Sequence, residues 1–72
     1  MTVFAEQEWM NARKAMVMEF APPIDIIVET FDYGNKLGVG VINGDVRCAV
    51  RINSMDQMPD AIDTLKSWMA EA

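Results

Sequence analysis

The sequence contains no histidine and a single cysteine, Cys48. Without histidine, one chain cannot form the Ser–His or Cys–His pairs that activate most nucleophiles. A single cysteine excludes an internal disulfide, and the lack of a cysteine or histidine cluster argues against a zinc site. Because Cys48 falls on the core side of a predicted strand, we interpret it as a structural thiol. We therefore expect no catalysis, no metal and no cofactor.

Basic residues and long apolar runs are also scarce. Six Lys or Arg stand against eleven Asp or Glu, a formal net charge of −5, so duplex DNA is a poor partner. No apolar stretch approaches the roughly 20 residues that cross a bilayer, and no basic region followed by an apolar core marks a signal peptide. These absences predict a cytoplasmic protein that does not insert into membranes.

The length of 72 residues predicts one domain, residues 1–72. So short a chain buries only about 60% of its unfolded surface, and small domains often add a disulfide, a metal or a second subunit. With the first two disfavoured, we expect a homodimer. Seven methionines strengthen this expectation, because flexible thioether side chains suit irregular interfaces.

Alternation of apolar and polar residues predicts three strands at about 24–33, 36–42 and 45–52. Gly34-Asn35 and Asn43-Gly44 are read as two-residue hairpin turns. These turns predict a register in which Tyr33 faces Lys36 and Ile42 faces Asp45. One face of the sheet is then strongly apolar and forms the core; its members are Val28, Thr30, Leu37, Val39, Val41, Val46, Cys48 and Val50.

The opposite face is nearly bare along the central strand, where Gly38 and Gly40 lie two residues apart. One reading is that neighbours fill the space, with Phe31 over Gly38 and Glu29 meeting Arg47 across Gly40. The other is a shallow groove for a partner, because glycine within a strand often marks a close approach. The candidate partner-binding residues on this face are Phe31, Tyr33, Arg47 and Arg51.

A helix is predicted on each side of the strands. The first has Thr2 as its cap, runs to about residue 18 or 20 and ends before Pro22-Pro23. Its main apolar stripe contains Ala5, Trp9, Ala12, Met16 and Phe20. A second stripe, Val3, Met10 and Val17, either binds another chain or widens the core stripe. The last helix starts near Ser54 or Asp56, has Pro59 in its first turn and runs to about Ala70.

This order predicts an α+β two-layer sandwich, with both helices on one face of a three-stranded antiparallel meander (αβββα). Asp56, Asp60 and Asp63 can share one side of the last helix. We interpret them as a solvated face near the helix N-terminus, and the alternative is a weak cation site or an acidic docking patch.

The missing catalytic inventory favours a non-catalytic module that binds another protein, as an inhibitor or regulator. In size, acidity and lack of motif, the chain resembles the small inhibitors that bacteriophages make, anti-CRISPR proteins among them. The alternative is an oligomeric enzyme or small-anion-binding subunit, in which Arg47 and Arg51 clamp a carboxylate or phosphate. A further hypothesis is strand pairing at an outer edge, for which residues 45–52 are better suited than the more acidic first strand.

Overall fold

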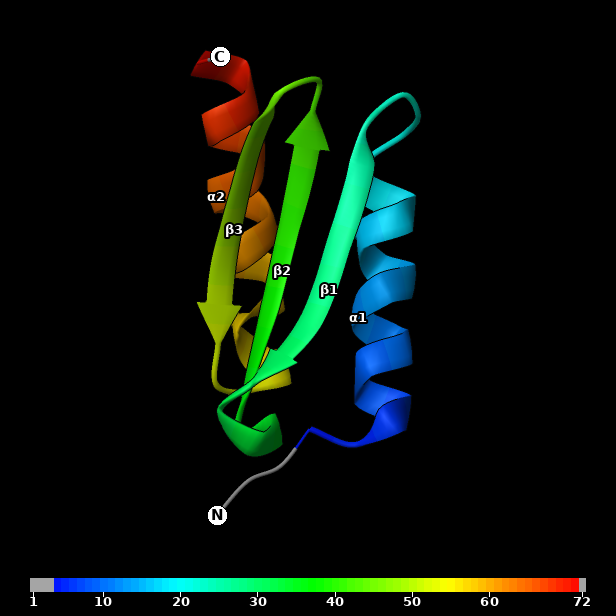
Figure 1. Ribbon diagram of the computed structural model, residues 1–72, viewed down its shortest axis with the longest axis vertical. Helices are drawn as coiled ribbons and strands as arrows, with labels where there is room; N and C mark the ends of the chain where they lie inside the picture. Colours follow the sequence, from blue (N-terminus) through cyan, green and yellow to red (C-terminus); the bar gives the residue numbers. More distant parts are fainter. Residues whose placement is uncertain (1–3, 72) are drawn as a thin grey trace.

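The computed structural model describes residues 4–71 and contains one antiparallel sheet backed by two helices (Figure 1). Both helices lie on the same face of the sheet, α1 along β1 and α2 along β3. The sheet order is β1-β2-β3, which confirms the predicted αβββα two-layer fold. The elements are α1 (Glu6–Glu19), β1 (Asp25–Phe31), the short 3-10 helix η1 (Asp32–Gly34), β2 (Lys36–Asn43), β3 (Val46–Ile52), the short 3-10 helix η2 (Met55–Gln57) and α2 (Met58–Glu71).

Helix α1 begins later than the sequence predicts. Its N-cap is Ala5, whose amide donates a hydrogen bond of 3.0 Å to Glu8 Oε1. This bond is one half of a capping box, and it satisfies an amide at the helix start without a hydroxyl cap. The prediction that Thr2 caps the helix is therefore wrong. Thr2 and Val3 both lie outside the described residues.

The strands present the predicted faces but pair in a different register. In the first hairpin Phe31, not Tyr33, faces Lys36. The expected two-residue turn at Gly34-Asn35 is instead a four-residue loop, in which Asp32, Tyr33 and Gly34 all have positive φ. The amide of Phe4 donates to the Gly34 oxygen at 2.7 Å, so the chain entering α1 holds this loop.

The second hairpin is displaced in the same way. Asn43 belongs to β2 and faces Val46, so the turn residues are Gly44 and Asp45 rather than Asn43 and Gly44. Gly44 has a φ of 67°, which fits a turn with glycine at its first central position. Relative to the predicted register, each residue of β2 pairs with a residue two positions away along β1 and along β3. An even shift keeps every side chain on its face.

The core lies between the sheet and the helices, and no polar or charged residue of the described chain is buried in it. It takes Ala12 and Met16 from α1 and Phe20 from the C-cap of that helix, which confirms the main stripe, although Ala5 is exposed. β2 lies at its centre and is buried from Leu37 to Val41. The buried apolar set is Phe4, Ala12, Met16, Phe20, Val28, Leu37, Val39, Val41, Ile52, Met58, Ala61 and Leu65.

Neighbouring side chains fill the face opposite the helices at Gly38. A Cβ placed there would collide with the Phe31 ring, as the first reading predicted. Gly40, however, is flanked by Ile27 and Ala49, so the predicted meeting of Glu29 and Arg47 across it is wrong. This face is a packed surface at Gly38 rather than a groove.

Candidate interaction surfaces

The outer face of α1 carries a cluster of exposed apolar side chains. Met10 is 50% exposed, Val17 54% and Met18 78%. With Trp9, Arg13 and Lys14 they line a shallow hollow of about 350 Å³, which we call the α1 hollow. The idea that Met10 and Val17 widen the core stripe is therefore wrong, because the solvent reaches half of each side chain.

Charge is unevenly distributed around the α1 hollow. Arg13 and Lys14 are exposed beside its apolar side chains, whereas the chain as a whole carries a net charge of −5. In the described part of the chain, neither cation forms an ion pair. The hollow is thus a basic, apolar patch on an acidic protein.

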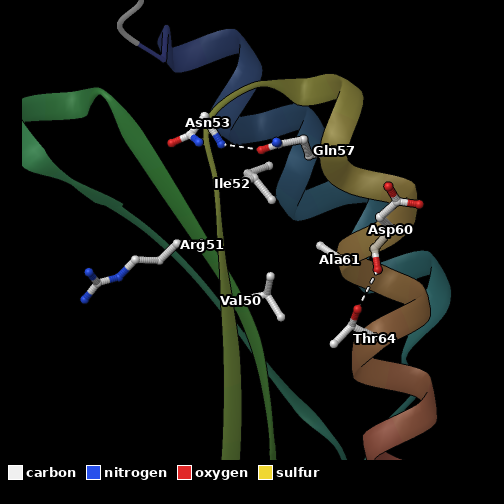
Figure 2. Close-up of a pocket in the computed structure, with 8 residues that line it drawn as sticks. All are labelled: Val50, Arg51, Ile52, Asn53, Gln57, Asp60, Ala61 and Thr64. Carbon is white, nitrogen blue, oxygen red and sulfur yellow. Dashed lines mark hydrogen bonds between the residues drawn. The ribbon is translucent and has the colours of Figure 1, made fainter.

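A second surface lies between the outer strand β3 and helix α2 (Figure 2). Val50, Ile52 and Ala61 point into the space between strand and helix, and Arg51 points to the opposite face of the sheet. This groove, which we call the β3–α2 groove, is shallow and measures about 240 Å³. Its polar lining residues are Asn53, Gln57, Asp60 and Thr64.

The polar groups of the β3–α2 groove are tied to the main chain. Thr64 Oγ1 donates to the main-chain oxygen of Asp60 at 2.9 Å, and the Asn53 amide donates to Gln57 Oε1 at 2.6 Å. The hydroxyl of Thr64 is therefore committed to helix α2 rather than paired with a base. These groups shape the rim and offer hydrogen bonds and apolar contact to an occupant.

The predicted sheet-face residues do not form one site. Arg47 and Arg51 are exposed on the face opposite the helices, and the Arg51 guanidinium lies 4.5 Å from the centre of the Phe31 ring. Tyr33 is 97% exposed and belongs to η1, beyond the end of β1. The expected cluster of Phe31, Tyr33 and two arginines is thus reduced to one stacked pair.

The remaining candidates are placed as follows. Cys48 is half-buried on the helix side of β3. Among residues 4–71, no three acidic or thiol groups gather closely enough to hold a metal ion. Within the same range, neither helix is long and apolar enough to cross a membrane.

Sequence reasoning missed two features. It counted Met18 only as part of a methionine surplus, although its spacing of eight from Met10 places the two on one helix side, about two turns apart. It also favoured residues 45–52 as a docking edge without finding the β3–α2 groove beside them, because the groove depends on how α2 packs. No protein-family model, curated protein or solved structure matches this chain significantly.

Proposed function

We propose that this chain is a small non-catalytic protein-binding module that occupies a surface of another protein. The observation that supports this most is the α1 hollow, where Met10, Val17 and Met18 are each half exposed or more. Contiguous apolar side chains rimmed by polar ones are typical of interaction sites. Helix faces of this kind bind through side chains three, four and seven residues apart.

The charges of the α1 hollow favour a particular target. Arg13 and Lys14 attract acidic side chains, which increase the rate of association and set the orientation of the complex. The target surface therefore presents carboxylates around an apolar contact. By covering such a surface, a small module acts as an inhibitor or regulator.

A second copy of the chain is a poor occupant of the α1 hollow. The midpoint between Met10 and Val17 falls between Arg13 and Lys14. A two-fold pairing of α1 centred there would bring Arg13 of one copy against Lys14 of the other, and such a like-charge contact is unfavourable. The homodimer predicted from the sequence therefore needs a different surface.

The test is affinity capture from the lysate of the native host with three baits. The first is the wild-type chain and the second is the double variant Met10→Glu, Val17→Glu. The third is the control Ser67→Glu, Ala70→Glu, which adds the same charge at exposed positions of α2. Circular dichroism checks that each bait is folded.

We expect one stoichiometric protein, identified by mass spectrometry, on the wild-type and control baits and its loss from the α1 variant. Its retention on the folded α1 variant would contradict the α1 hollow as the binding surface. A clean lane for the wild-type bait at several salt concentrations would contradict the binding module itself.

A further inference from the structure

The two outer strands of the sheet differ in how their edges are covered. In an antiparallel sheet, the main-chain groups of alternate residues of an outer strand point away from the sheet. In β1 these include Val28, whose oxygen accepts a hydrogen bond of 3.0 Å from Trp9 Nε1. The Trp9 side chain, which comes from α1, thus occupies the β1 edge at Val28.

The same alternation fixes the outward groups of β3. The main-chain groups of Val28 point away from β2, so Val28 and its partner Val39 share no ladder hydrogen bonds. The main-chain groups of Val39 instead bond to those of Val50 in β3. The outward main-chain groups of β3 are therefore those of Arg47, Ala49 and Arg51. Within the described chain none of these groups forms a hydrogen bond with a side chain, and β3 is an exposed edge.

One apolar side chain at this edge stands out. Val46 lies at the start of β3, on the helix side of the sheet, and is 53% exposed. At the other end of the same strand, the β3–α2 groove offers Val50 and Ala61 as apolar lining. The β3 edge thus carries an exposed apolar side chain, Val46, near one end and the apolar β3–α2 groove near the other.

We propose that β3 pairs with β3 of a second copy of this chain, so that two three-stranded sheets join into one of six strands. In the pairing centred on Cys48, the Val46 side chain of each copy faces Val50 of the other. Each hairpin tip then lies at the partner's β3–α2 groove. The contact is self-complementary, as a two-fold interface requires.

Charge selects this register over its neighbour. A pairing centred on Ala49 would place Arg47 directly opposite Arg51 of the second copy, and like charges opposite each other destabilise a sheet. The pairing centred on Cys48 places Arg47 opposite Ala49 and brings Asp45 of the second copy beside Arg51. Arg51 can then exchange its stack on Phe31 for an ion pair with Asp45.

The same register gives the interface a chemical probe. The two Cys48 residues face each other as a non-hydrogen-bonded pair, whose Cα atoms are about 4.5 Å apart. This separation is within the range that a disulfide spans. Diamide, added as oxidant, removes two hydrogens from the two thiols and is itself reduced as one S–S bond forms.

The first experiment uses matched valines. Val46 and Val17 are 53% and 54% exposed, so Val46→Lys and Val17→Lys place the same charge at equally exposed sites. We expect sedimentation equilibrium to show a dimer for the wild type and for Val17→Lys. For Val46→Lys we expect a dissociation constant raised by about tenfold or more, with loss of the diamide-induced disulfide.

The second experiment tests the register with single-cysteine chains. One carries Cys48→Ser with Val46→Cys, and the other carries Cys48→Ser with Val50→Cys. We expect diamide to link the two chains when they are mixed and to leave each one alone unlinked. Two self-linked products with no mixed product would overturn the pairing centred on Cys48.

The oligomeric state of the purified chain tests the dimer without any target protein. A wild-type chain that stays monomeric up to millimolar concentration overturns the proposal. So does a dimer that Val17→Lys disrupts and Val46→Lys leaves intact, because that result places the interface on α1. Circular dichroism of all variants separates loss of pairing from loss of folding.

Discussion

The guanidinium group of Arg51 lies 4.5 Å from the centre of the Phe31 ring, across the sheet from β3 to β1. Between them is Gly38 of β2, where a Cβ would collide with the ring. A cation over an aromatic face is attracted to the electrons of the ring. The glycine thus makes room for an aromatic ring, and the ring holds an arginine from the far strand.

Replacing each glycine of β2 by alanine is expected to give unequal effects. At Gly40 the new methyl group meets the main-chain oxygen of Cys48 and the Cβ of Ala49, the latter at 2.9 Å. Gly40→Ala should therefore lower the free energy of unfolding by about 1–3 kcal/mol. At Gly38 the three atoms nearest the new methyl group all belong to the Phe31 ring, whose side chain can move, so Gly38→Ala should cost less. Urea unfolding measures both, and a larger loss for Gly38→Ala would contradict the reasoning.

Trp9→Phe is expected to reveal the contribution of the bond to Val28. Phenylalanine retains most of the apolar surface but leaves the Val28 oxygen without its indole donor. We expect a loss of about 1–2 kcal/mol in the free energy of unfolding. Trp68→Phe is the control, because Trp68 is also half-buried and no side-chain hydrogen bond is seen for it in the described chain. Equal losses for the two variants would show that packing alone accounts for Trp9.

The contact between Lys66 and Glu19 links α2 to the end of α1 and gives the stability a pH dependence. A hydrogen bond from Lys66 to Glu19, followed by the negative charge of Glu19, raises the pKa of Lys66 above its ordinary 10.5. A raised pKa in the folded state stabilises the protein below the unfolded pKa and loses that effect as the pH rises through the folded pKa. The contribution of the pair should therefore disappear above about pH 10.5.

The variant Glu19→Gln tests this pH dependence. It should return the pKa of Lys66 toward its ordinary value in an NMR titration of the Lys66 side chain. The difference in unfolding free energy between wild type and variant should shrink as the pH passes above 10.5. An unchanged Lys66 titration in Glu19→Gln would disprove the assigned cause.

Two methionines two residues apart in α1 provide a matched comparison of burial. Met16 is fully buried, whereas Met18 is 78% exposed. Met16→Ala should cost about 2–5 kcal/mol, because it removes core contacts and leaves a cavity. Met18→Ala should change stability by no more than about 0.5 kcal/mol. Thermal unfolding of the two variants distinguishes them, and similar midpoints would refute the assignment of α1 faces.

The sequence predicted the faces of the strands better than their partners. Faces follow from the two-residue period of a strand, which the apolar residues display directly. Which residues pair across strands depends on the length of the connecting loop. Here the loop is lengthened by Asp32 and Tyr33, whose positive φ values could not be predicted from the sequence. Aspartate tolerates this conformation, but a tyrosine rarely adopts it, and the Phe4–Gly34 bond that holds the loop comes from a distant part of the chain.

The candidate surfaces were only partly predictable for the same reason. Met10 and Val17 share a helix side through their spacing of seven, so the second stripe was visible in the sequence. Val50 and Ala61 meet at the β3–α2 groove only because α2 returns along β3. The hydrogen bond from Trp9 to Val28 at the β1 edge joins residues 19 positions apart, so no local sequence pattern predicts it.

The indole of Trp9 has a consequence for how far association can go. A sheet with two open edges can add strands without limit, which is the geometry of fibrils. In the proposed pairing at β3, each end of the joined sheet is a β1 strand whose Val28 oxygen already accepts a hydrogen bond from Trp9. A further strand added there would have to displace this hydrogen bond, so the indole of Trp9 opposes growth beyond two copies.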